Sequence, residues 1–160
     1  MKLQFIVLPI HQVDCLEEQI KKDKEINQNI DTIILFLDNG TKNSSRRTLW
    51  IWSLIMLSIK LNVTIELVYY PPYHSKYNLI EHFWGVFQRS WNGLIIDNLT
   101  KLIGAINGTK WHGINAKGIL VEEEHFKGQT LDKEELKKLI DKHIVYENVN
   151  IKKWSLIITP

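Results

Sequence analysis

A chain of 160 residues can bury a sizeable core, and 44% hydrophobic with 24% charged residues is typical of a folded globular protein, which excludes extended disorder. The single cysteine, Cys15, excludes an internal disulfide and a zinc site built from several thiolates, and it indicates a reducing, cytoplasmic setting. A formal charge of +2 is compatible with nucleic acid binding but does not by itself indicate it.

No segment has the pattern of a signal peptide or a membrane span. The N-terminal apolar run is short and lacks a small-residue cleavage site. The most apolar stretch, residues 49–61, contains two serines and a lysine and is too short to cross a bilayer, so we expect a buried helix and no membrane partner. Six tryptophans are an unusual surplus, and we expect most of them in the core.

The first half of the chain predicts alternating strands and helices. Residues 2–8 could form a short strand, and residues 11–24 have apolar residues at helical spacing. The apolar run 32–37 predicts a strand buried on both faces, which Asn39-Gly40 ends with a sharp turn.

A helix from about Ser45 to Leu61 and a second strand over residues 63–69 follow. A strand, a helix of this length and another strand form a βαβ unit, so the two strands should be parallel neighbours. The predicted fold class is therefore α/β.

The second half predicts three helices. The first runs from about Leu79 to Trp91 after a capping Asn78, and it has Glu81 at its third position, as in a capping box. Further helices are expected over residues 99–106 and from a capped start at residues 130–134 to about His143, whereas residues 109–128 and the C-terminal tail have no clear pattern.

Two carboxylates stand where a metal site is expected. Asp38 follows the strand 32–37 at its carboxyl end, which is the edge of an open α/β sheet where sites occur. Glu81 opens a helix that follows the neighbouring strand, so both side chains can reach that edge. Hard oxygen ligands suit Mg²⁺ or Mn²⁺, and a metal pair can activate a water or a 3′-hydroxyl for phosphodiester chemistry.

Each carboxylate also has an ordinary structural explanation. Asp38 precedes Asn-Gly and is a good turn former, and Glu81 can be the reciprocal member of a capping box. These roles are the commoner ones for either residue alone. Their occurrence on consecutive strand-and-helix units favours a shared site.

Two longer motifs resemble a transposase family. The segment 37–47, with LDNG followed by NSSRR, and the segment 70–84, YPPYHSKYNLIEHFW, closely resemble insertion-sequence transposases of the ISAzo13-like family. The family pattern is a strand ending in D-[NS]-G, then N-x-S-R, then PP-x-x-S-K-x-N-x-I-E-H. The likeness continues through residues 90–93 and is good over residues 30 to 95.

The resemblance implies an RNase H-like DDE catalytic domain that cuts and joins DNA at transposon ends with Mg²⁺ or Mn²⁺. Asp38 matches the family's second catalytic aspartate and Glu81 its final glutamate. Expected partners are transposon-end and target DNA, and a second copy or a full-length transposase. Contacts to DNA phosphates are expected from polar and basic residues of the two motifs: Asn43, Arg46, Arg47, His74 and Lys76.

One departure from the family is large. Its first aspartate lies on the first strand of the sheet, upstream of the matching segment, and no Asp here stands on a comparable strand: Asp14, Asp23 and Asp31 all precede the strand 32–37. We therefore expect an N-terminally truncated transposase. Residues 1–109 would be the C-terminal part of the catalytic domain, and residues 110–160 a C-terminal extension.

Three functions follow from these observations. The first is a metal-dependent transposase domain. The second is a catalytically inactive remnant that at most binds DNA or a transposase partner, and the missing third carboxylate favours it. The third function is a nuclease whose remaining ligand is Glu66, His82 or Asp97. His82 adjoins Glu81 and points to a different face of the helix.

Overall fold

The computed structural model describes residues 12–37, 48–71, 78–120, 132–146, 149–151 and 154–160. The chain divides into two compact units. One, here the sheet unit, comprises Met1–His74 and Thr130–Pro160, and the other, here the helical unit, comprises Ser75–Gln129.

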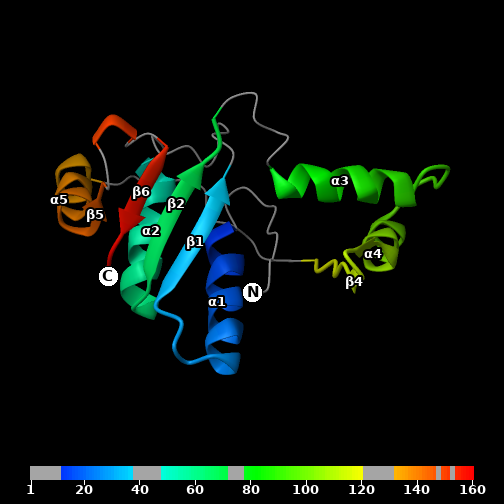
Figure 1. Ribbon diagram of the computed structural model, residues 1–160, viewed down its shortest axis with the longest axis horizontal. Coiled ribbons are helices and arrows are strands. Elements are labelled where there is room, and N and C mark those ends of the chain that lie inside the picture. The colour runs from blue at the N-terminus through cyan, green and yellow to red at the C-terminus, as the bar shows by residue number, and fades with distance from the viewer. Residues whose placement is uncertain (1–11, 38–47, 72–77, 121–131, 147–148, 152–153) are drawn as a thin grey trace. The chain divides into compact units, whose positions relative to one another are not determined.

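The sheet unit contains one four-stranded mixed sheet in the order β1-β2-β6-β5 (Figure 1). Its strands are β1 (Thr32–Leu37), β2 (Thr64–Tyr69), β5 (Ile144–Val145) and β6 (Ser155–Ile158). β1 and β2 are parallel, with Thr32 opposite Thr64 and Leu37 opposite Tyr69. The predicted α/β class and the parallel pair are confirmed.

The C-terminal tail, to which the sequence assigned no element, forms the third strand of the sheet. β6 runs antiparallel to β2 on one side and to β5 on the other. A short helical turn, η2 (Val149–Ile151), precedes it. β6 therefore links the last residues of the chain to the centre of the sheet.

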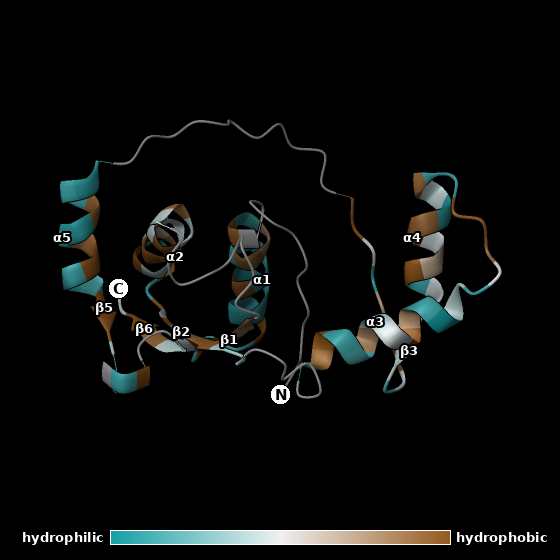
Figure 2. Cartoon of the chain, turned by 90° about the horizontal axis from the view of Figure 1, so that it is seen from above, coloured by the Kyte–Doolittle hydropathy of each residue, from teal (hydrophilic) through white to brown (hydrophobic). Residues whose placement is uncertain are grey.

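Helices α1 (Gln12–Ile26) and α2 (Thr48–Leu61) lie on the same face of the sheet, as Figure 2 shows. Alternate strand residues point to that face and are buried there, including Ile65 and Leu67 of β2 and Leu156 and Ile158 of β6. α2 contributes one face to the core, formed by Trp50, Ile51, Leu54, Ile55, Leu57 and Ser58. The expected buried helix is confirmed.

The prediction that the strand 32–37 is buried on both faces is wrong. Ile34 and Phe36 are 51% and 58% exposed, whereas Leu35 packs against the core. α1 and α2 cover only one face of the sheet, so the alternate residues of β1 on the other face stay open in the part of the chain that the structure describes. Phe36 there stacks on Tyr70, with ring centroids 6.1 Å apart.

Charged and polar contacts hold α1, α2 and β2 together. Glu17 of α1 accepts hydrogen bonds from Lys21 and, at 2.9 Å, from Lys60 of α2. The hydrogen bond from Lys21, followed by that from Lys60, lowers the pKa of the Glu17 carboxyl. The buried Ser58 hydroxyl donates to the carbonyl of Val63 at 2.7 Å, which fixes the tight connection from α2 to β2.

Helix α5 (Lys133–His143) begins after its N-cap Asp132 and contacts α2. The buried His143 Nδ1 lies 2.9 Å from the carbonyl oxygen of Thr159, and the Thr159 N–H donates to the His143 carbonyl at 2.8 Å. These contacts join the end of α5 to the last residues of the chain.

The helical unit contains α3 (Leu79–Ser90), α4 (Leu99–Gly108) and a hairpin of β3 (Lys110–Trp111) and β4 (Ile114–Asn115). The hairpin turn has positive φ at both central residues, His112 (48°) and Gly113 (81°), as a tight two-residue turn requires. The Ser90 hydroxyl lies 2.8 Å from that of Thr109, which joins the end of α3 to the end of α4.

The expected core position of most tryptophans is wrong for the described residues. Trp50 is buried, whereas the others are only half-buried: Trp52, Trp84, Trp91, Trp111 and Trp154. None of the described helices is long and apolar enough to cross a membrane.

Burial of Tyr69 makes the stability of the sheet unit sensitive to alkaline pH. Burial raises the pKa of the Tyr69 phenol from 10.0 to about 12, against an opposing effect of the Trp50 indole. Because the folded pKa lies above the unfolded one, the resulting stabilisation is complete below about pH 10 and is lost as the pH rises to about 12. A shift of this size corresponds to roughly 3 kcal/mol.

We therefore expect Tyr69→Phe to flatten the loss of unfolding free energy between about pH 10 and pH 12, measured by urea denaturation. Tyr146→Phe is the matched control, because that ring is exposed, and it should leave the alkaline loss unchanged. Equal pH profiles for Tyr69→Phe and the unchanged protein would contradict the assignment.

Candidate catalytic site

The parallel pair of β1 and β2 determines where the two motif segments begin. Leu37 and Tyr69, the last residues of the two strands, are register partners. The Tyr70 N–H donates to the Leu37 carbonyl at 2.8 Å, so the strand ends are hydrogen-bonded to each other at one edge of the sheet. Residues 38–47 and 72–77 both follow from this edge, although they lie outside the described residues.

Asp38 belongs to the first of these segments, directly after β1. Its predicted role as a metal ligand therefore stays a prediction. The described backbone supports the expectation in one respect, because β1 ends at Leu37 and runs parallel to its neighbour. The carboxyl edge of parallel strands is the edge at which α/β domains place their sites.

Glu81 lies in the first turn of α3, as expected, and its side chain is exposed. Asn78 is the N-cap: its Oδ1 accepts a hydrogen bond from the Ile80 N–H at 3.3 Å. The Asn78 Nδ2 donates to Glu81 Oε1 at 3.5 Å, which is a long contact. An exposed carboxylate in the first helical turn is favoured by the helix dipole and presents hard oxygen donors to solvent.

This geometry only partly matches the capping-box explanation of Glu81. In a capping box the glutamate side chain reaches back to the backbone N–H of the cap residue. Here its partner is the side chain of Asn78 instead, and the Glu81 N–H bonds to the Asn78 carbonyl at 3.1 Å. Asn78 caps the helix largely without the carboxylate of Glu81, which leaves that carboxylate available for another role.

The three alternative third ligands gain no support from the described residues. Glu66 lies in the middle of β2, with Ile34 and Ile157 as its register partners. His82 is exposed next to Glu81, and Asp97 accepts a hydrogen bond from Lys101 at 2.9 Å. Across the described part of the chain, no three His, Cys, Asp or Glu residues lie close enough to hold a metal ion.

The other aspartates lie where the sequence suggested. Asp14 and Asp23 are in α1, and Asp23 accepts a hydrogen bond from Gln19 at 3.0 Å. Asp31 immediately precedes β1, and its carbonyl accepts the Thr64 N–H at 2.8 Å. None of these three stands at the carboxyl end of a strand.

The expected DNA-binding residues lie outside the described residues: Asn43, Arg46, Arg47, His74 and Lys76. Their contacts to DNA stay predictions. Arg46 and Arg47 immediately precede α2, whose described part begins at Thr48.

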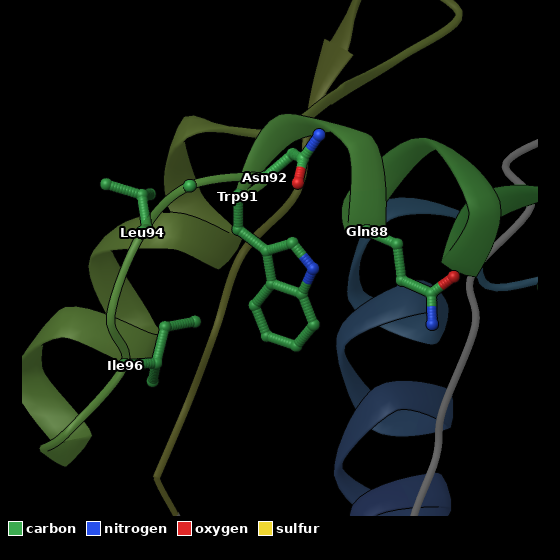
Figure 3. A pocket seen from close by; sticks show the side chains of 6 residues that line it. Gln88, Trp91, Asn92, Leu94 and Ile96 are labelled. Carbon is green, nitrogen blue, oxygen red and sulfur yellow. The ribbon is translucent and has the colours of Figure 1, made fainter.

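One feature of the helical unit was not predicted. An open pocket of about 350 Å³ lies at the end of α3 and the segment after it, and Figure 3 shows the side chains that line it. One sequence signal could have indicated this pocket. The helix ends at Trp91-Asn92-Gly93, so no following helical turn covers the Trp91 ring.

A family model for a transposase DDE domain matches residues 13–160. Because the match covers nearly the whole chain, the chain belongs to the DDE transposases. The particular family is described as the Rhodopirellula transposase DDE domain. The match reaches the last residue, beyond the segment 30–95 on which the resemblance was strongest. No curated protein and no solved structure matches the chain.

Membership of this family implies phosphoryl-transfer chemistry on DNA, and DDE transposases generally use divalent metals. The donor at Glu81 fits such a metal, because it is an exposed carboxylate in the first turn of a helix. The RNase H-like assignment and the domain boundary at residue 109 both stay predictions.

The cap at Asn78 should orient Glu81 as well as stabilise α3. We expect Asn78→Ala to lower the free energy of unfolding by about 1 kcal/mol and to weaken metal-dependent activity, because Glu81 loses a side-chain partner. Asn98→Ala is the matched control, since Asn98 caps α4 by accepting the Lys101 N–H at 2.9 Å.

Thermal unfolding and DNA strand transfer, both measured for each variant, check this expectation. Asn98→Ala should lower stability by a similar amount while activity per folded molecule is retained. Equal activity losses in the two variants would show that the Asn78 side chain acts only through helix stability.

Proposed function

We propose that this chain carries the second and third carboxylates of a DDE transposase site, Asp38 and Glu81, and that the domain cuts and joins DNA at transposon ends. The observation that carries this proposal is the family match over residues 13–160. The parallel register of β1 with β2 supports it, because Asp38 directly follows the end of β1. The exposed, capped position of Glu81 supports it independently.

In this proposal Asp38 and Glu81 hold Mg²⁺ or Mn²⁺ through carboxylate oxygens. Metal ions bound there would activate a water or a 3′-hydroxyl and would stabilise the leaving oxygen of the phosphodiester. The protein contributes ligands on regular elements, since β1 ends at Leu37 and Glu81 lies within α3.

The DNA would be held by the two motif segments. Arg46 and Arg47 can clamp phosphates at the start of α2, and Lys76 can do so in the segment before α3. Asn43 and His74 complete the proposed set with neutral hydrogen-bonding groups. We include a second transposase subunit among the proposed partners.

A second candidate is a chain that binds DNA or a full-length transposase without cutting DNA. The observation that favours it is the absence of a third carboxylate at a strand end within the described residues, where Asp14, Asp23 and Asp31 all lie elsewhere. A site with one carboxylate fewer binds metal more weakly and cannot hold two ions in the required geometry.

Removal of either proposed ligand should abolish strand transfer. We expect Asp38→Asn and Glu81→Gln each to lower the rate on transposon-end DNA with Mn²⁺ by more than about a hundredfold, since loss of a residue that only supports a ligand already costs 10- to 100-fold. Glu135→Gln is the matched control, because Glu135 also lies in the first turn of an exposed helix, α5. Unchanged rates in both ligand variants would exclude the proposed site.

Metal titration separates the two candidates. If the chain holds a complete site, calorimetry with Mn²⁺ should show tight binding at two sites that Glu81→Gln removes. If it is a non-catalytic remnant, binding should be weak, the Glu81→Gln variant should behave like the unchanged chain, and DNA binding should persist without metal.

A further inference from the structure

The pocket at the end of α3 is formed by six residues that include no charged side chain: Gln88, Trp91, Asn92, Gly93, Leu94 and Ile96. Figure 3 shows the Trp91 indole between Gln88 on one side and Ile96 on the other. A lining without charge does not suit a phosphate group or a metal ion. At about 350 Å³ the pocket is at the small end of the range for organic ligands.

A hydrogen-bonded turn builds this pocket. The Trp91 N–H bonds to the Phe87 carbonyl at 3.3 Å as α3 ends, and the Leu94 N–H bonds to the Trp91 carbonyl at 2.8 Å. Gly93 has φ of +87°, a conformation that L side chains rarely adopt, and so it lets the chain turn here. The turn brings Leu94 and Ile96 to the pocket that Trp91 lines.

The Trp91 ring is supported from within the unit. The centroid of the Phe87 ring lies 4.4 Å from that of Trp91, and Phe87 is only 2% exposed. Phe87 also stacks on Phe83, with ring centroids 6.2 Å apart. The indole therefore has a fixed aromatic support while it remains half-exposed at the pocket.

The lining combines the groups that recognise a nucleobase. An indole offers a flat surface on which any base can stack. The carboxamides of Gln88 and Asn92 each carry a donor and an acceptor, which is the pairing that reads base edges. Ile96 and Leu94 add apolar surface for a neutral heterocycle.

The described residues of the helical unit carry more positive than negative side chains, which suits the phosphates of a nucleic acid strand. The described residues of the helical unit include four cations and two carboxylates: Arg89, Lys101, Lys110, Lys117, Glu81 and Asp97. Lys101 is paired with Asp97. Arg89, in the last turn of α3, directly follows Gln88 in the sequence and is exposed.

We propose that the Trp91 pocket binds an unpaired nucleobase of the DNA substrate. The base must be unpaired, because a base inside a duplex presents neither its face nor its pairing edge to a protein pocket. The inference rests on the proposed function, since it takes DNA as the ligand. It adds a recognition site for single-stranded or flipped-out bases, outside the motif segments that carry the proposed metal ligands.

The test compares DNA duplexes that differ at one position: fully paired, with one bulged base, and with a bulged abasic site. Binding is measured by fluorescence anisotropy in EDTA, so that no metal-dependent step contributes. The full chain should bind the bulged-base duplex roughly tenfold more tightly than the abasic one, from stacking and amide contacts. Trp91→Ala should remove that difference, and Trp91→Phe should keep part of it.

Two further variants distinguish base binding from loss of folding. Gln88 is exposed, so Gln88→Ala should fold normally and still reduce the preference for the base. Trp52→Ala removes a half-buried tryptophan of α2 in the sheet unit and should keep the preference. Circular dichroism of each variant checks the fold.

Equal affinity of the full chain for the bulged-base and abasic duplexes overturns the inference, as does a preference that survives both Trp91→Ala and Gln88→Ala. Strand transfer could survive Asp38→Asn and Glu81→Gln while Trp91→Ala loses the preference for the bulged base. That result would contradict the proposed catalytic site and support base binding in the pocket.

Discussion

The parallel pairing of β1 with β2 is the constraint on which the rest of the sheet unit depends. It holds six residues of each strand in register and brings the carboxyl ends of both to one edge. The Tyr69 N–H bonds to the Trp154 carbonyl at 2.7 Å, just before β6, so the C-terminal segment fixes the same edge from the other side. Two segments distant in sequence, each with a family motif, thus start from neighbouring points on a rigid support.

Local signals predicted most of the elements. β1 was predicted at its observed bounds because it is an apolar run followed by a turn signal, and α3 because Asn78 caps it. β6 could not be predicted in this way. Its four residues become a strand through pairing with β2, about ninety positions earlier in the chain, and a short apolar segment carries no mark of so distant a partner. The prediction for the burial of β1 was wrong for a related reason. An apolar run does not show whether helices cover one face of the sheet or both.

The candidate site was predictable in part for the same reasons. The position of Glu81 in the first turn of a helix follows from its distance from the cap, and the structure confirms it. The parallel pairing of β1 and β2 follows from the βαβ pattern. The Trp91 pocket was not predictable from spacing, because it depends on the turn at Gly93 that brings Leu94 and Ile96 to the ring. Whether a tryptophan is covered depends on the path of the chain after it.

The position of β1 in the sheet has a consequence for handling the protein. In the part of the chain that the structure describes, β1 pairs only with β2, so β1 is an edge strand of the described sheet. Native proteins protect such edges with charges, prolines, bulges or a covering segment, because an open apolar edge is a template for aggregation. The sequence TIILFL offers no charge and no proline. The colloidal behaviour of the purified chain therefore depends on what covers this one strand.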